Sequence, residues 1–171
     1  MKKTSLILAL ALILSVAAKA QNNWAVKQLD NRLSVKFPSE PQKVIKNGND
    51  SYMVKEKDSV VYSAGAIDLK LVAGLDSVAL APLKDKQQFA DQVVLGIASQ
   101  KPTYTFGDVT VGKWNNYTTY NATGVENTTK NKLFIEMIII GSKMYSLSCR
   151  VPANLNTKNN ELFLSSPALL K

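Results

Sequence analysis

Residues 133–151 read LFIEMIIIGSKMYSLSCRV, and this stretch decides the fold. Residues 133–140 are apolar at nearly every position, which is typical of a central strand that is covered on both faces of a sheet. Gly141 and Ser142 predict a two-residue hairpin turn. The returning strand, residues 144–151, places Tyr145, Leu147, Cys149 and Val151 on one face. We therefore expect an antiparallel hairpin at the centre of a sheet.

Several shorter strands are expected before this hairpin. Residues 32–37 alternate strictly, with Leu33, Val35 and Phe37 on one face and polar side chains on the other. Residues 42–46 and 51–56 predict two short strands around the turn residues Asn47-Gly48-Asn49-Asp50, since Asn and Gly tolerate positive φ. Residues 60–69 predict a further strand.

The middle of the chain predicts one long helix. Residues 71–83 are an apolar stretch that contains Gly74 and Pro82, and we expect it to be irregular. Asp85 is suited to cap the helix, with Gln88 completing a capping box. The helix then places Phe89, Val93 and Ile97 on one face and ends at Pro102.

The remaining pattern indicates an α+β fold. Residues 103–111 and 114–123 are rich in Thr, Tyr and Val and predict two strands. A short C-terminal helix is expected near residues 157–164. Because most strands follow one another directly along the chain, the sheet should be mainly antiparallel, with two helices covering what it leaves open.

The first twenty residues predict an export signal. Lys2 and Lys3 precede an apolar run at residues 6–18, and Ala18-Lys19-Ala20 has the small-x-small pattern of a signal-peptidase site. The run is too short to span a membrane, which takes about 20 residues. We expect cleavage before Gln21, one domain at residues 21–171 without a membrane span, and a periplasmic or secreted location in a Gram-negative bacterium.

The charge balance argues against nucleic acid as a partner. The chain has 21 Lys and Arg against 13 Asp and Glu, a formal net charge of +8, and three of these lysines lie in the predicted signal. Arg32 and Arg150 are the only arginines, whereas base readout and phosphate clamps favour arginine. The lysines are scattered along the chain. We expect a solvated surface and a monomer.

Motifs along the chain resemble those of PsbP-like domains in their order. Trp24 is followed by a strand that runs into FPSEP at residues 37–41, and TFGDVTVGKW, GSKMYSLSCRVP and ELFLSSP follow at residues 105–114, 141–152 and 161–167. Over about Trp24 to Leu170 the chain is similar to this fold group, which also includes Mog-type proteins and DcrB-like exported domains. The resemblance implies an α/β/α sandwich with a mainly antiparallel sheet of about six to seven strands and two flanking helices. It also implies a non-catalytic accessory or binding protein without a cofactor.

Composition and spacing argue against the common catalytic and metal sites. There is no histidine, which removes Ser-His and Cys-His nucleophile systems and the commonest zinc ligand. Residues 107–113 read GDVTVGK, the spacing of a phosphate-binding loop, but Trp114 stands where such a loop needs Ser or Thr. The β-branched residues 109–111 favour a strand with glycine bends instead. Cys149, the only cysteine, lies on an apolar strand face and is expected to be an inert core residue.

Aromatic and amide residues gather in one stretch of the chain, Trp114-Asn115-Asn116-Tyr117 followed by Tyr120-Asn121. Sugar-binding surfaces use such a mixture, because a ring face stacks on the sugar and amides bond to its hydroxyls. The same residues are also ordinary strand formers beside turn-prone asparagines. We name Trp114, Tyr117 and Tyr120 as candidate ligand-binding residues.

Three functional hypotheses follow from the sequence. The leading hypothesis is an exported, non-catalytic domain that binds an envelope protein or assembly. The alternative is a small-ligand or glycan-binding module that uses the three aromatic residues. The third is a hydrolase that works with paired carboxylates, although the aspartates are spread singly along the chain, at Asp58, Asp68, Asp76, Asp85, Asp91 and Asp108.

Overall fold

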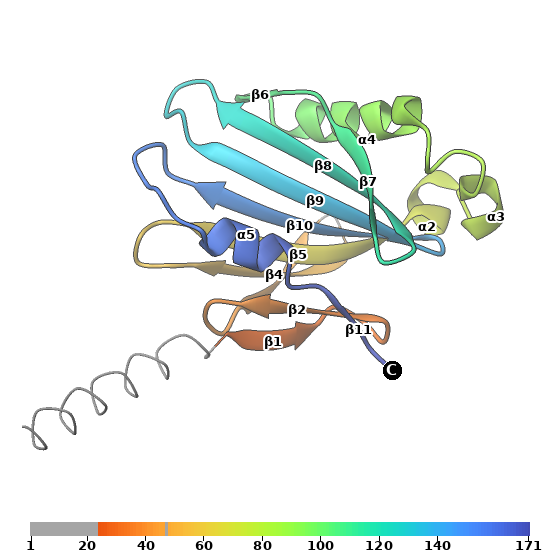
Figure 1. Cartoon of the computed structure of the whole chain (residues 1–171), viewed down its shortest axis with the longest axis horizontal. Helices are drawn as coiled ribbons and strands as arrows, with labels where there is room; N and C mark the ends of the chain where they lie inside the picture. The colour runs from red at the N-terminus through yellow and green to blue at the C-terminus, as the bar shows by residue number, and fades with distance from the viewer. Residues whose placement is uncertain (1–23, 47) are drawn as a thin grey trace, which may run out of the picture.

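The computed structural model describes residues 24–46 and 48–171, in which two antiparallel sheets and four helices are arranged in layers (Figure 1). The predicted export signal, residues 1–20, and Asn47 of the predicted turn lie outside the described residues. The large sheet contains β3 (Gln42–Lys46), β4 (Asn49–Lys55), β5 (Val61–Asp68), β6 (Tyr104–Phe106), β7 (Thr110–Trp114), β8 (Tyr117–Glu126), β9 (Lys132–Ile140) and β10 (Lys143–Val151). The small sheet contains β1 (Ala25–Gln28), β2 (Leu33–Phe37) and β11 (Ala168–Leu169). The helices are α2 (Leu69–Ala73), α3 (Ser77–Leu80), α4 (Gln87–Gln100) and α5 (Asn159–Leu164).

The predicted central hairpin is confirmed. β9 and β10 pair antiparallel from Ile140 opposite Lys143 to Lys132 opposite Val151. Gly141 has a φ of 65°, which a two-residue turn requires and glycine adopts without strain. The large sheet has the order β3-β4-β5-β10-β9-β8-β6, with β7 paired to β8, so the hairpin lies at its middle.

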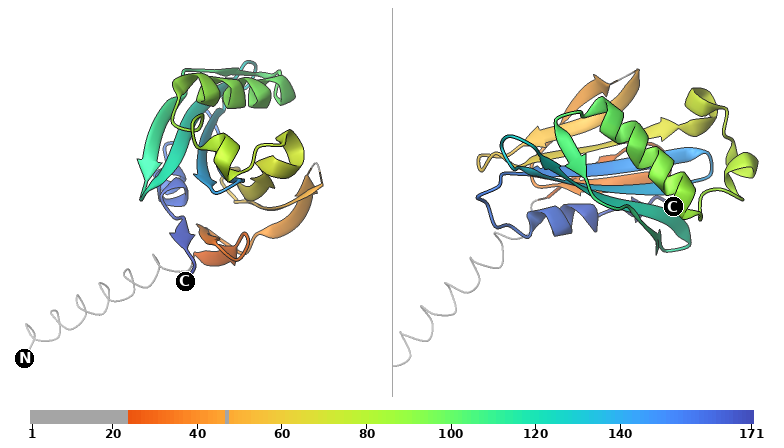
Figure 2. Two further views of the ribbon diagram at one scale, coloured as in Figure 1. Left: turned by 90° about the vertical axis from the view of Figure 1, so that its right-hand side faces the viewer. Right: turned by 90° about the horizontal axis from the view of Figure 1, so that it is seen from above.

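Different layers cover the two faces of the large sheet. We call one the helix face, because α4 packs Ala90 and Val94 against the side chains of Ile135, Met137 and Tyr120 there. We call the other the outer face. On it, β2 and α5 supply Val35, Phe37 and Phe163, which pack with Tyr62, Leu147 and Cys149. Figure 2 shows the strongly curved sheet with α2, α3 and α4 on one side and α5 and the small sheet on the other.

The α+β class and the mainly antiparallel sheet are confirmed, but the strand count differs from the expected six to seven in one sheet. The large sheet has eight strands, and a second sheet has three. The strand at residues 33–37 does not join the large sheet. It pairs with β1 and β11 and lies across the outer face, because Leu33, Val35 and Phe37 are needed there to cover apolar residues. The outer layer is therefore a small sheet together with α5.

The two strands predicted at residues 103–111 and 114–123 are three strands in the structure. Residues 107–109 break the first into β6 and β7, and both parts pair with β8. Trp114 ends β7 instead of beginning the next strand. Asn115 has a φ of 50°, a conformation that asparagine tolerates, and the hairpin turn therefore falls at Asn115 and Asn116.

The stretch at residues 71–83, expected to be irregular, contains two short helices. The carboxylate of Asp68 accepts a hydrogen bond from the Lys70 amide and begins α2, and Gly74 ends it in the left-handed conformation. Asp76 caps α3 in the same way. These caps are side-chain hydrogen bonds that stabilise helices too short to show an apolar period.

The predicted capping box at Asp85 and Gln88 is wrong. The N-cap of α4 is Lys86, which makes no side-chain capping bond. The carboxylate of Asp85 is engaged elsewhere, since it accepts hydrogen bonds from Lys113 on β7 and Thr118 on β8. The predicted apolar face of the helix is confirmed, because Phe89, Val93 and Ile97 pack against the helix-face core.

Asp30, in the turn between β1 and β2, fastens the small sheet to the large one. One carboxylate oxygen accepts hydrogen bonds from the backbone amides of Arg32 at 2.8 Å and Leu33 at 3.2 Å. The other accepts from Lys143 Nζ and the Tyr145 hydroxyl, both at 2.7 Å. Partial burial raises the pKa of this carboxyl, but the hydrogen bonds from the four donors outweigh burial and lower the pKa from 3.8 to about 2.

The low pKa of Asp30 makes stability depend on pH. A depressed pKa contributes stability that is present above the unfolded-state pKa and is lost as pH falls through the folded-state pKa. We expect the free energy of unfolding to fall by about 2 kcal/mol for this reason between about pH 5 and pH 2. Asp30→Asn should remove this part of the pH dependence in urea unfolding curves. The exposed Asp91→Asn on α4 is the control, and an Asp30→Asn curve that keeps the full acid slope would contradict the assignment.

Candidate functional site

Trp114 and Tyr117 form an aromatic pair where the β7–β8 hairpin turns. Their ring centroids are 6.3 Å apart and their planes differ by 29°, a stacked arrangement. The register places the two residues directly opposite each other. Both side chains are half-buried and pack on the outer-face residues Leu33, Ile138 and Ile140. The structure thus brings together two of the three predicted ligand-binding residues.

Tyr120 does not join this pair. It lies three residues beyond Tyr117 on β8, so its side chain points to the helix face, where it is fully buried. Its hydroxyl donates a hydrogen bond to the carbonyl oxygen of Lys84 at 2.6 Å, and its ring packs near Phe89 of α4. The prediction treated the three aromatic residues as one surface, but the alternation of side chains along a strand separates them.

Two polar residues continue the outer face beyond the aromatic pair. Asn121 on β8 and Glu136 on β9 are directly opposite each other in the register. Asn121 is exposed and Glu136 is half-buried. Among the described residues, neither side chain has a hydrogen-bond or ion-pair partner. Glu136 was not predicted as a site residue, although it is the single charge within the apolar run at residues 133–140.

Burial raises the pKa of the Glu136 carboxyl above its ordinary value of 4.5. No neighbouring positive charge counteracts the effect of burial, unlike at Asp30. A carboxylate that is kept half-buried without a partner lowers stability at neutral pH, and such groups cluster at functional sites. The outer face around Glu136 is therefore a candidate binding surface.

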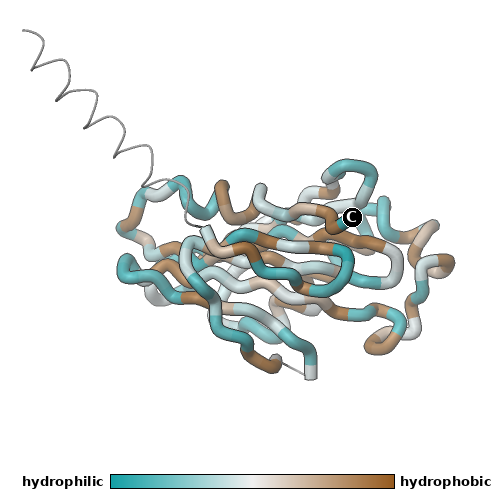
Figure 3. Tube along the Cα trace, turned by 90° about the horizontal axis from the view of Figure 1, so that it is seen from below, coloured by the Kyte–Doolittle hydropathy of each residue, from teal (hydrophilic) through white to brown (hydrophobic). Residues whose placement is uncertain are grey.

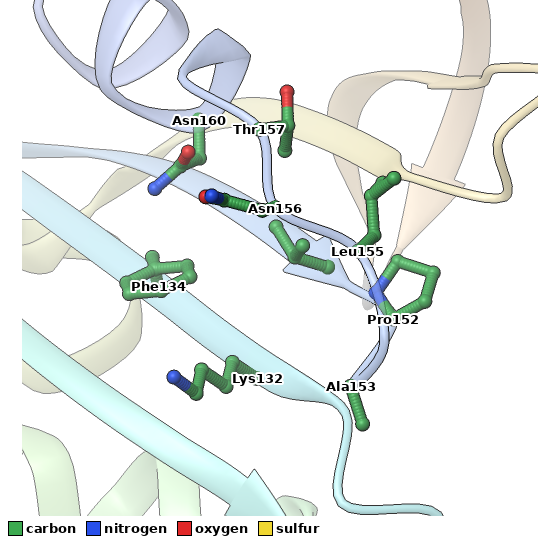
Figure 4. Close-up of a pocket in the computed structure, with 9 residues that line it drawn as sticks. Lys132, Phe134, Pro152, Ala153, Leu155, Asn156, Thr157 and Asn160 are labelled. Atoms are coloured by element: carbon green, nitrogen blue, oxygen red, sulfur yellow. The ribbon is translucent and has the colours of Figure 1, made fainter.

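A small cavity lies farther along the outer face, between β9 and α5 (Figure 4). Its volume is about 130 Å³, and its lining includes Lys132, Phe134, Leu155 and Asn160. Figure 4 shows the amide side chains of Asn156 and Asn160 extending toward the Phe134 ring. Pockets for small-molecule ligands usually measure about 300–1,000 Å³, so this cavity is too small to be the main site.

An apolar projection lies at one end of the molecule. Leu71 and Val72 on α2 are 83% and 60% exposed, and Val78 on α3 is 78% exposed. We call these three residues the apolar tip. Leu69 and Leu80 at the base of the two helices are buried in the helix-face core. Figure 1 shows α2 and α3 projecting beyond the sheet, and Figure 3 shows hydrophobic segments at the same end.

Four of the aspartates considered for paired-carboxylate chemistry have structural partners. Asp68 and Asp76 cap helices, Asp58 accepts the amide of Val60, and Asp85 pairs with Lys113. Cys149 is fully buried, and burial raises the pKa of its thiol to about 12. Residues 107–113, with the spacing of a phosphate loop, lead into β7 and not into a helix. Within residues 24–46 and 48–171 there is no group of three or more His, Cys, Asp or Glu that could hold a metal ion.

In the part of the chain that the structure describes, no helix has both the length and the apolar character needed to cross a membrane.

Comparisons with known proteins include one distant structural similarity. No family model and no curated protein matches the chain. Among solved structures, the chain is similar to a crystal structure from Bacteroides thetaiotaomicron VPI-5482 at 1.50 Å resolution, with 14% sequence identity and a TM-score of 0.47. The similarity covers 81% of this chain and 45% of that chain, so this chain spans less than half of that protein's length.

Glu136→Gln should raise the free energy of unfolding at pH 7. The raised pKa means that the folded state opposes ionisation, and this penalty is present above the folded-state pKa and vanishes as pH falls below 4.5. Urea unfolding at pH 7 and pH 3.5 should show the gain at pH 7 only. Glu161→Gln, an exposed site on α5, is the matched control. A lower stability of Glu136→Gln at pH 7 would show that the carboxylate has a stabilising partner.

Proposed function

We propose that this protein is an exported, non-catalytic accessory domain of the PsbP-like type that binds a protein of the cell envelope through the apolar tip. The observation that carries the proposal is the exposure of Leu71, Val72 and Val78 on two helices that are firmly held. Large aliphatic side chains that are exposed together mark interaction sites on soluble domains. The export signal predicted from residues 1–20 and the order of the PsbP-like motifs support the proposed location and family.

The side chains of the apolar tip are exposed although the two helices that carry them are capped and anchored in the core. Asp68 and Gly74 fix the two ends of α2, and Asp76 fixes the start of α3. Leu69 and Leu80 anchor both helices in the core. The intervening aliphatic residues are therefore held outward in a defined arrangement, which lowers the entropy that a partner must remove on binding.

Charge around the apolar tip indicates the chemistry of its partner. Lys70 is exposed on α2 next to Leu71, whereas the carboxylate of Asp76 is occupied by capping bonds to two backbone amides. A partner that fits this surface has an apolar patch with acidic residues at its rim. We favour binding over catalysis because Asp85 and Asp30 are paired with lysines and Cys149 is buried, so these groups already have structural roles.

Site-specific photo-crosslinking in the native envelope tests this proposal. A photoreactive residue at position 71 or 78 should give an adduct with one envelope protein, whereas position 45 should not. Ile45 is the matched control, because it is 76% exposed and lies on the edge strand β3, not on α2 or α3. The proposal also requires that this protein and the crosslinked envelope protein bind each other when both are purified. The double variant Leu71→Glu with Val78→Glu should weaken that binding at least about tenfold. Adducts with lipid only, or equal adducts at position 45, would overturn it.

A further inference from the structure

The outer face of β7, β8 and β9 carries a second set of groups that lack partners. The indole N–H of Trp114 and the hydroxyl of Tyr117 have no hydrogen-bond partner among the described residues, although both rings are stacked and held on the core. Buried Trp and Tyr polar atoms normally find a partner. Here both side chains are partly exposed, so these atoms are available to a ligand that lies against the rings.

The register assembles a polar row next to the aromatic pair. Thr110 on β7 lies opposite Asn121 on β8, and Asn121 lies opposite Glu136 on β9, so the three residues form one row across three strands. An asparagine amide offers two donors and an acceptor, and a carboxylate offers acceptors only. The row therefore matches a ligand that presents several hydroxyl groups.

One row of residues separates the aromatic pair from the polar row. The intermediate row contains Gly112, which has no side chain, Thr119, which is 3% exposed, and Ile138, which is fully buried, so this row is covered and a ligand would have to pass over it. A Cβ added at Gly112 would lie 3.0 Å from Thr119 Oγ1, so the two strands pack tightly at this point. Tyr117 and Asn121 are four residues apart on β8, which places the two groups about 13 Å apart.

The rest of the fold leaves the side of this area that holds the polar row open. α5 packs on the outer face at β10 and β9, and β11 pairs with β2. In Figure 1, α5 lies in front of β10, and no helix lies in front of β8. Asn121, Thr123 and Val125 on this face of β8 are exposed, as expected for a sheet surface without a covering layer.

We propose that the outer face of β7–β9 is a binding site for an uncharged oligosaccharide, with Trp114 and Tyr117 stacking on one sugar ring and Asn121 and Glu136 bonding to hydroxyls farther along the chain. The spacing of the two groups exceeds one sugar ring, so the ligand has at least two. The lone carboxylate of Glu136 disfavours uronic-acid and sulfated sugars. This site is separate from the apolar tip and does not rest on the function proposed above.

A glycan array followed by calorimetry tests the site. The purified protein should bind uncharged oligosaccharides, and the affinity for the corresponding monosaccharide should be at least about tenfold weaker, because it reaches one group only. Asn121→Ala and Glu136→Gln should each weaken oligosaccharide binding about tenfold or more. Both residues are at the surface of the sheet, so these variants test the site without removing a core contact.

The aromatic end of the site needs its own variants. Trp114→Ala and Tyr117→Ala should weaken binding at least about tenfold. Since both rings pack on the core, Trp114→Phe is the second variant, which keeps the packing and removes the indole N–H. Tyr104→Ala is the matched control, because Tyr104 forms a similar ring pair with Phe106 on β6 and should leave binding unchanged.

Three outcomes would overturn the proposal. The first is the absence of binding to every uncharged oligosaccharide on the array. The second is binding that the Asn121, Glu136 and Trp114→Phe variants leave unchanged. The third is a photo-crosslink from position 117 to an envelope protein with no oligosaccharide binding, which would assign the outer face to a protein partner.

Discussion

The whole structure depends on one constraint, which is that the hairpin of β9 and β10 must be kept from water on both faces. On β9, the side chains of Leu133, Ile135 and Met137 point to the helix face, whereas those of Ile138 and Ile140 point to the outer face. Burial of apolar surface stabilises by about 25 cal/mol per Å², so neither face can be left open without a large loss. Two separate coverings are therefore needed. α4 with α2 and α3 supplies one, and β2 with α5 supplies the other.

The sequence is informative where periodicity and turn chemistry act locally. Residues 133–151 predict the central hairpin, and Phe89, Val93 and Ile97 predict the face of α4 that packs on the core. Boundaries that depend on single side-chain bonds were not predictable in this way. Asp68 caps the start of α2, and Asp85 pairs with Lys113 instead of capping α4. β11 has only two residues, and its existence depends on pairing with β2.

The candidate sites show the same division between local and long-range information. Trp114 and Tyr117 were predicted on one strand, but in the structure they lie on two strands and face each other across the β7–β8 turn. The prediction placed the break between the strands at residues 112–113, whereas the turn falls at Asn115 and Asn116, and the alternation along β8 then sends Tyr120 to the other face. Glu136 is more than a dozen residues from Asn121, and only the pairing of β8 with β9 brings them together. The contrast between Asp30, which has four donors, and Glu136, which has none, also arises only from tertiary structure.

The pairing of β11 with β2 has a consequence for how the chain acquires its structure. A polypeptide that emerges N-terminus first, from a ribosome or through a secretion channel, presents β2 and β5 long before β10, α5 and β11 are in the same compartment. β5 pairs with β10, and Phe37 packs on Phe163, near the last residues of the chain. Such long-range contacts make folding slow and delay it until late in synthesis or transport. The topology thus keeps the chain unfolded, and able to pass through a channel, until β10, α5 and β11 have also emerged.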